Sequence, residues 1–208
     1  MSVTLTLDSI RLPRGTLGEL TLRFDTGVHL LTGPNGIGKT SLLNAIAGSL
    51  PLVSGRMLFA GEPLDHLDAQ VVLAPNSPPE MPWIRSGLLL DFITSLYPRS
   101  RRDAAYAGQV KQELGLGSFL DAPLGTLSAG TARKVLLAAT LIAAPPVLLF
   151  DEPTNDIDVA SIAAFLGFVA EAAAQRVVIM TTHHGGDLGV LSPVIHALES
   201  RAGQSRVS

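Results

Sequence analysis

The sequence predicts an α/β fold with a mainly parallel sheet, an N-terminal antiparallel β subdomain and a helical insertion lobe. Three observations support this prediction. A glycine-rich loop separates a short apolar stretch at residues 28–31 from a segment with helical spacing at 41–47. Residues 86–143 are mostly helical in pattern, and from residue 147 strand and helix patterns alternate again. Alternation of this kind indicates parallel strands joined by crossover helices. We expect a single domain over residues 1–208, with the lobe at about 86–143.

The first half of the chain supplies most of the predicted strands. Polar and apolar residues alternate at 3–7 and 20–24, as in antiparallel strands with one buried face. The helix that follows the glycine loop should stop at Gly48 and Pro51. Further strands are expected at 56–61 and 70–74. Residues 75–82 are too rich in proline for a regular helix or a central strand.

The second half is expected to contain helices at 87–96, 101–114 and 129–143, then a strand at 147–151, a helix at 159–174 and strands at 177–181 and 194–198. The most apolar stretch, residues 135–150, is interrupted by Pro145 and Pro146. A membrane-spanning helix needs about 20 apolar residues. A buried helix followed by a buried strand explains the stretch better, and we expect a soluble protein with a frayed polar tail from Glu199.

Composition excludes several classes of function. The net charge of −3 over 208 residues argues against binding nucleic acid through a general positive field. The chain has no cysteine, so neither disulfides nor thiolate metal sites are available. The N-terminal residues lack the basic and apolar regions of a signal peptide. These features are compatible with a reducing cytoplasm.

Residues 33–41 read GPNGIGKTS and fit the pattern G-x-x-x-x-G-K-[ST]. In this pattern backbone N–H groups wrap a di- or triphosphate, the lysine reaches the β- and γ-phosphates, and the hydroxyl binds Mg²⁺. The loop also precedes a helix, whose N-terminus favours anions. The alternative, a glycine-rich turn without a ligand, is disfavoured by the correct placement of both Lys39 and Thr40. We therefore predict a P-loop NTPase core with these phosphate-binding residues: Gly33, Pro34, Asn35, Gly36, Ile37, Gly38, Lys39, Thr40 and Ser41.

Two carboxylates, Asp151 and Glu152, follow the apolar strand predicted at 147–150. Ligands bind at the carboxyl ends of strands in open parallel sheets. Asp151 is thus placed to hold Mg²⁺, and Glu152 to polarise the attacking water as a general base. The alternative is that both acids only begin a surface turn before Pro153. His183, after the next strand, could hydrogen-bond the γ-phosphate or be structural.

Four segments together resemble the nucleotide-binding domain of ABC-type ATPases. They are GPNGIGKTS, LSAGTARKV at 127–135, VLLFDEPTNDID at 147–158 and TTHH at 181–184. The resemblance runs from about residue 3 to 198, and LSxG is its most specific part. It implies that Ser128, Ala129 and Gly130 bind the ATP held by an opposite subunit. Function would then need a head-to-tail pair with two ATP molecules between the subunits, most simply a C₂ homodimer.

The resemblance implies roles for further residues. Thr40 and Asp151 would attend Mg²⁺, Glu152 would be the catalytic carboxylate, and His183 would be the switch histidine. Asp158 would belong to the loop that touches the partner subunit. Asn76 stands where the family usually has a glutamine that contacts Mg²⁺. The aromatic that usually stacks on adenine is missing, with Arg11 or Leu12 in its region, so we expect weaker or less base-selective nucleotide binding.

Among ABC proteins, a short chain of this kind is similar to the ATPase subunit of a transporter whose permease is a separate chain, and the heme-exporter subfamily often carries LSAG. Such a subunit would be cytoplasmic and peripheral on the inner face of the membrane. Residues 77–92 would receive the permease, with Trp83 either exposed there or packed in the core. The alternatives are a soluble ABC ATPase in iron–sulfur assembly or one that works with nucleic acid or ribosomes.

Overall fold

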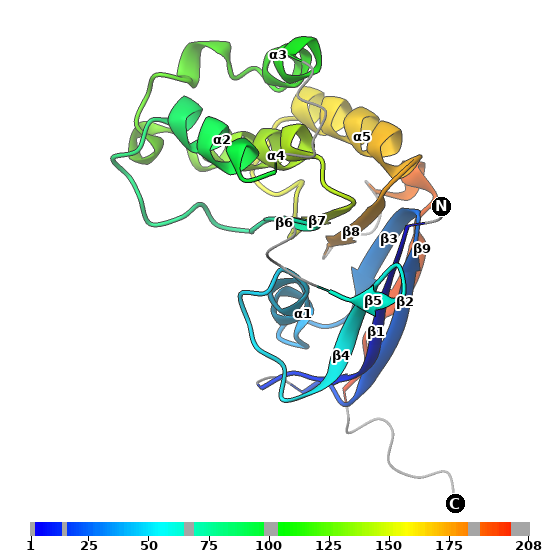
Figure 1. Cartoon of the computed structure of the whole chain (residues 1–208). Helices are drawn as coiled ribbons and strands as arrows, with labels where there is room; N and C mark the ends of the chain where they lie inside the picture. The colour runs from blue at the N-terminus through cyan, green and yellow to red at the C-terminus, as the bar shows by residue number, and fades with distance from the viewer. Residues whose placement is uncertain (1–2, 14–15, 65–68, 98–103, 183–187, 201–208) are drawn as a thin grey trace, which may run out of the picture.

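The computed structural model describes residues 3–13, 16–64, 69–97, 104–182 and 188–200, and the described chain forms two sheets flanked by helices (Figure 1). The larger sheet has five strands, and each of its pairings is parallel. This confirms the predicted α/β fold and its parallel sheet. In spatial order the strands are β6 (Val71–Ala74), β7 (Val147–Phe150), β8 (Val177–Thr181), β3 (Gly27–Thr32) and β9 (Val194–Ala197).

The parallel sheet is buried on both faces, which explains why its central strands are continuously apolar. In β7, Leu148 and Phe150 pack into the core on the side of the helical lobe. Val147 and Leu149 pack into a second core on the opposite face. The first core lies beneath α4 (Ala129–Ala143) and α5 (Val159–Ala173), and the second beneath α1 (Lys39–Ile46) and the antiparallel sheet (Figure 1).

The antiparallel sheet contains the N-terminal strands, as predicted. β1 pairs with β2 on one side and with β4 on the other. Leu5 and Leu7 point into the second core, while their neighbours are only partly buried, so the alternation seen in the sequence is the alternation of faces. The strand order is β2 (Leu20–Asp25), β1 (Thr4–Arg11), β4 (Ser54–Phe59) and β5 (Glu62–Pro63). Strand β5 is absent from the sequence-based expectations, because two residues carry no periodic signal.

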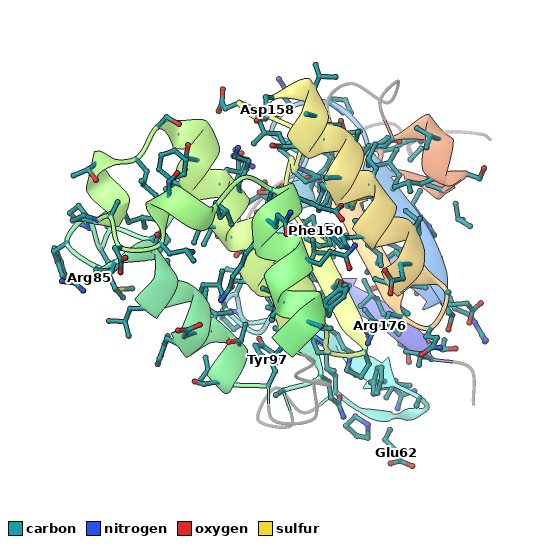
Figure 2. The ribbon with its side chains drawn as sticks, turned by 90° about the horizontal axis from the view of Figure 1, so that it is seen from above. Glu62, Arg85, Tyr97, Phe150, Asp158 and Arg176 are labelled. Atoms are coloured by element: carbon teal, nitrogen blue, oxygen red, sulfur yellow. The ribbon has the colours of Figure 1, made fainter. Side chains whose placement is uncertain are left out.

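The helical lobe lies over one face of the parallel sheet. It contains α2 (Ser86–Ser95), α3 (Ala104–Glu113) and α4 (Ala129–Ala143), with short 3₁₀ turns at Gly117–Phe119 and Leu124–Thr126. Figure 2 looks down on this face, with Phe150 among the helices and Asp158 and Arg176 near opposite ends of α5. No helix in the described ranges is long and apolar enough to span a membrane.

Helix α4 shows how local sequence sets the ends of an element. Its N-cap is Ser128, whose Oγ accepts a hydrogen bond from the N–H of Thr131 at 3.1 Å. It ends at Ala144, which is left-handed and stands before Pro145 and Pro146. Strand β7 begins directly afterwards, so the apolar stretch at 135–150 is a helix followed by a strand, as predicted.

Candidate nucleotide-binding site

The loop between β3 and α1 requires glycine at specific positions. Gly33, Gly36 and Gly38 have φ values of 144°, 75° and 120°, which residues with a Cβ rarely adopt. A Cβ on Gly33 would also lie 2.7 Å from the carbonyl oxygen of Leu198, just after β9. The backbone therefore has the tight form that the motif predicts, and α1 begins at Lys39 with its N-terminus at the loop.

Lys39 curls back over the loop. Its Nζ donates to the carbonyl oxygens of Gly33 at 2.8 Å and Pro34 at 3.3 Å, and the residue is only 6% exposed. A buried ammonium group held among backbone groups is suited to an anionic ligand, because phosphate oxygens can replace the carbonyl acceptors.

Thr40 and Asp151 meet although 111 positions separate them. The Thr40 hydroxyl donates to Asp151 Oδ2 at 2.9 Å, and the Thr181 hydroxyl donates to Asp151 Oδ1 at 2.6 Å. Asp151 directly follows β7 and is 3% exposed. Its N–H donates to the carbonyl oxygen of Ala74, at the end of the neighbouring strand β6, at 3.0 Å. A hydroxyl and a carboxylate side by side are hard oxygen ligands of the kind Mg²⁺ prefers.

Glu152 lies in the same site as Lys39. Both line a cavity of about 250 Å³, and Glu152 is 5% exposed. Glu152 has a φ of +50°, a left-handed conformation that is unusual for a residue with a side chain. The other residues that line the cavity are Asn35, Gly36, Gly38, Thr40, Ser41 and Asn76. This cavity therefore brings together several of the predicted phosphate residues with Glu152, and Asp151 adjoins it through the hydrogen bond with Thr40.

Asn76 lines this cavity, but its two oxygen atoms accept hydrogen bonds from a residue that the sequence analysis did not single out. The Arg133 guanidinium donates to both the carbonyl oxygen and Oδ1 of Asn76. Arg133 is 6% exposed and lies on the buried face of α4, in helical register with Leu136 and Thr140. A charged residue on an otherwise apolar helix face needs buried partners, and that pattern could have identified it.

The signature segment is built differently. Ser128 and Ala129 are exposed, and the contact of Ser128 with Thr131 is local. Gly130 packs against the loop after β7: a Cβ there would collide with the carbonyl oxygen of Asp156. The described lining of the Lys39 cavity includes no residue of this segment.

Asp158 is the N-cap of α5. Its carboxylate accepts from the N–H of Ser161 at 2.9 Å, from the Ser161 hydroxyl at 2.8 Å and from Lys134 Nζ at 3.1 Å. These hydrogen bonds, led by the Ser161 N–H, hold the pKa of Asp158 well below its usual range. The predicted His183 and its neighbour His184 lie outside the described residues.

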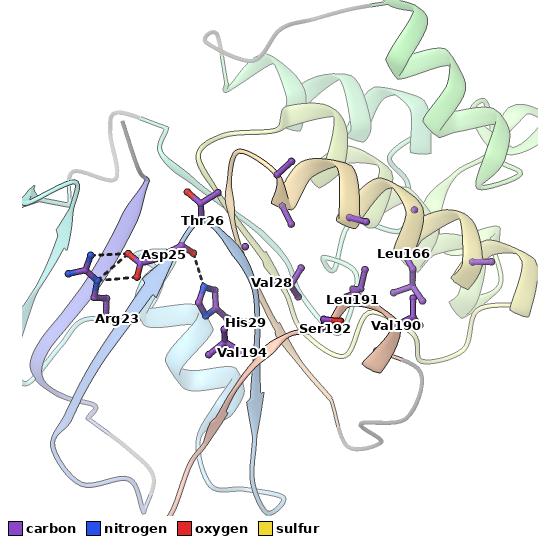
Figure 3. A pocket seen from close by; sticks show the side chains of 16 residues that line it. Arg23, Asp25, Thr26, Val28, His29, Leu166, Val190, Leu191, Ser192 and Val194 are labelled. Atoms are coloured by element: carbon purple, nitrogen blue, oxygen red, sulfur yellow. Dashed lines mark hydrogen bonds and ion pairs between the residues drawn. The ribbon is translucent and has the colours of Figure 1, made fainter.

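A larger hollow of about 940 Å³ lies away from these residues, between α5, β3 and the turn at Gly189–Leu191 (Figure 3). Its walls are mostly apolar, and its polar end carries the ion pair of Arg23 with Asp25 at 3.0 Å. None of the residues that line it lines the Lys39 cavity. Size alone therefore does not identify the site, whereas the converging polar groups at Lys39 do.

The glycine loop ahead of a helix, with its lysine and hydroxyl beside the acids that end a buried parallel strand, defines a P-loop nucleoside triphosphatase. The family model described as "ABC transporter" matches residues 17–155. The chain belongs to the ABC transporter family and is an ATPase of the kind that supplies the ATP-binding subunit of a transporter.

Known relatives agree with this membership. The cytochrome c biogenesis ATP-binding export protein CcmA of Pseudomonas syringae pv. syringae is 34% identical over 80% of this chain and 80% of its own length. The zinc transport system ATP-binding protein TroB of Treponema pallidum is 29% identical, over 81% of this chain and 66% of its own.

Solved structures show the same fold. A structure of an ATP-binding subunit of an ABC transporter superposes with a TM-score of 0.83 at 22% identity, over 94% of this chain and 85% of that one. A putative ABC transporter ATP-binding protein from Pyrococcus furiosus gives 0.77 at 26% identity, over 94% and 97%.

Proposed function

We propose that this chain hydrolyses ATP to drive export through a separate membrane permease. The observation that carries the proposal is that Lys39, Thr40 and Glu152 line one cavity and Thr40 is hydrogen-bonded to Asp151, in a chain 34% identical to an export ATPase. None of the relatives and structures reported above carries a name from iron–sulfur assembly or nucleic-acid work. Transport is therefore the function we retain.

The cavity suits a chemistry of phosphate binding and water activation. The loop from Gly33 to Ser41 would hold the phosphates of ATP, with Lys39 neutralising their charge. Thr40 and Asp151 would hold Mg²⁺, aided by Asn76, and a bound Mg²⁺ would offset charge that develops on the phosphates. Glu152 would accept a proton from the attacking water, and His183 would serve as the switch histidine that the sequence predicts.

The signature segment supports a dimer in which each ATP is bound by two subunits. Ser128, Ala129 and Gly130 start a helix of 15 residues, and the first two are exposed. An exposed helix N-terminus with a serine can receive a phosphate from another molecule. We infer a head-to-tail pair, with the loop that leads to Asp158 close to its partner.

We infer that the permease binds to exposed apolar side chains of the helical lobe and of the segment that precedes it. Trp83 is 74% exposed, so it does not pack in the core. Together with exposed side chains around it and along α2, it forms what we call the docking surface: Met81, Trp83, Leu88, Phe92 and Leu96. Exposed aromatic and methionine groups are typical of partner interfaces. A permease bound there would place the chain on the inner face of the cell membrane.

Membrane fractionation tests this proposal. In cells that make the protein at native level, we expect it in the membrane fraction, and Trp83→Asp should move most of it to the soluble fraction. Val53→Asp is the matched control, because Val53 is 61% exposed but lies before β4, away from the docking surface. A photo-crosslinking residue at position 83 should capture a multi-span membrane protein. Recovery of the wild-type protein only from the soluble fraction, with no membrane partner, would contradict the transporter function.

A further inference from the structure

The peptide of Glu152 is held in its left-handed conformation from two sides. Such a conformation costs free energy in a residue with a Cβ and persists only where the surroundings impose it. Here the N–H of Glu152 donates to Thr181 Oγ1 at 2.9 Å, and its carbonyl oxygen accepts from Arg133 Nη1 at 2.8 Å. Both backbone hydrogen-bonding groups of the residue are thus bound by buried side chains.

Thr181 makes two contacts with one hydroxyl. Its Oγ1 accepts the N–H of Glu152 and donates its own proton to Asp151 Oδ1 at 2.6 Å. The residue is 0% exposed and ends β8, the strand next to β7. One hydroxyl therefore contacts both neighbouring acidic residues, Asp151 through its carboxylate and Glu152 through its backbone N–H.

Arg133 makes the matching contact from the helical lobe. Nη1 also reaches the carbonyl oxygen of Asp151 at 3.3 Å, and Nη2 contacts Asn76 after β6. The pKa of Arg133 is lowered, mainly because the side chain is buried. The nearby carboxylates of Asp156, Asp151 and Glu152 oppose this shift. The guanidinium connects α4, which begins at the signature segment, with the end of β7.

We propose that Thr181 and Arg133 are positioning residues that hold the Glu152 peptide left-handed and so aim its carboxylate at the attacking water. The proposal rests on the role of Glu152 as general base. It also gives α4 a direct connection to that base, because a shift of α4 moves the group that binds the Glu152 carbonyl. Neither residue is among those that line the Lys39 cavity.

Thr181→Val tests the contact from the sheet, since valine keeps the shape and removes the hydroxyl. A misplacement of about 1 Å costs on the order of a hundredfold in rate. We expect kcat to fall about ten- to a hundredfold, while the dissociation constant for ATP stays within about twofold. Thr181→Ser should recover most of the rate. Thr140→Val is the matched control, because Thr140 is 1% exposed but lies towards the far end of α4.

Arg133→Lys tests the contact from the lobe, because lysine keeps the charge but cannot bind Glu152 and Asn76 together. We again expect lower kcat at unchanged ATP affinity. Arg176→Lys is its control, as Arg176 binds the carbonyl of Ala144 at 3.1 Å, away from the site. Melting temperatures are measured alongside. A lower melting temperature with wild-type kcat would mean a structural role only and would overturn the proposal.

Glu152→Gln separates this proposal from the one on which it rests. If Glu152→Gln is inactive while Thr181→Val and Arg133→Lys turn over normally, the positioning role is wrong and the general base remains. If Glu152→Gln hydrolyses ATP normally, the general base itself is wrong. Should Thr181→Val fail to fold, Arg133→Lys decides by the same comparison of kcat with ATP affinity.

Discussion

The phosphate loop and the signature segment both begin a helix, yet they differ in how much of their surroundings the chain supplies. Lys39 is 6% exposed, and Thr40 next to it reaches a carboxylate 111 positions away. Ser128 and Ala129 are exposed, and the side chain of Ser128 contacts Thr131, three positions on. The first region is completed by long-range contacts within the chain, whereas the second presents its polar group outward.

This difference separates two kinds of functional sequence. A motif whose partners come from its own chain is already arranged when the chain folds, as the Thr40–Asp151 contact shows. A motif that presents a helix N-terminus to solvent is suited to bind a group from another molecule, which we propose is the ATP of a second subunit. The two regions should therefore respond differently to substitution, and two experiments measure by how much, while a third tests a strand that leads into the phosphate loop.

The largest effect is expected at the phosphate loop. Lys39→Ala removes the buried cation that faces the phosphates, and we expect ATP affinity to fall on the order of a hundredfold or more. Glu152→Gln, in the same cavity, should keep ATP affinity and lose turnover. Calorimetric titration with ATP and a phosphate-release assay distinguish the two.

Lys111→Ala is the control for the charge change, because Lys111 lies on α3 and pairs only weakly with Asp91 at 3.9 Å. It should leave both quantities unchanged. Equal ATP affinity in Lys39→Ala and wild type would show that the loop does not depend on its own lysine.

An intermediate effect is expected at the signature segment. Gly130→Ala introduces a methyl group against the carbonyl oxygen of Asp156, and crowding of this kind typically costs about 1–3 kcal/mol. Stability and turnover should fall, but ATP affinity of the isolated subunit should not, because the lysine cavity is elsewhere. Thermal unfolding and calorimetry measure both.

Gly108→Ala provides the comparison. Gly108 lies within α3, and a Cβ at this position would have nothing within 4 Å, so alanine there should stabilise the helix by about 0.5–1 kcal/mol. A loss of ATP affinity in Gly130→Ala as large as in Lys39→Ala would remove the distinction between the two regions.

The smallest effect concerns a histidine pair on the neighbouring strands β3 and β9. His29 Nε2 donates to the carbonyl oxygen of Asp25 at 2.7 Å (Figure 3), so His29 Nδ1 accepts from His196 Nε2 at 3.0 Å. This hydrogen bond joins β3, which leads into the loop, to β9. Burial lowers the pKa of both histidines from 6.5, and for His196 the neighbouring His29 lowers it further.

A lowered pKa fixes the sign of the pH dependence. Between the folded pKa and 6.5 these histidines bind more protons in the unfolded chain, so their contribution to the free energy of unfolding falls as pH drops through this range and is constant above it. Urea unfolding between about pH 5 and pH 8 measures this. His196→Gln should flatten the slope relative to wild type, and an unchanged slope would exclude the pair as its source.

Much of this molecule could be predicted from local patterns. The helix at 129–143 has its predicted bounds, since Ser128 caps it and two prolines follow it. The phosphate loop is identifiable from residue types and spacing, because the backbone form itself requires glycine. Local patterns can mark Arg133 as a charge on a buried helix face, but they do not identify the carbonyl groups it binds, which belong to segments 57 and 19 positions away.

Trp83 marks another limit of local patterns. The sequence is equally compatible with a core tryptophan and an exposed one, because the proline-rich segment around it has no clear periodicity. In the structure the Trp83 side chain is 74% exposed. The burial of a loop residue depends on which distant segments pack over it, and the residues next to it in sequence do not indicate this.

By itself the sequence determined the α-helices, the strands other than β5, the phosphate loop and the acids that follow β7, because each depends on backbone preferences and periodicity over a few residues. Only the tertiary structure decided two further meetings of polar groups, Thr181 with Glu152 and Arg133 with Asn76. Those meetings follow from the strand order β6-β7-β8-β3-β9, which places segments distant in sequence side by side. That order is set by the burial of both sheet faces together, a property that no short segment carries.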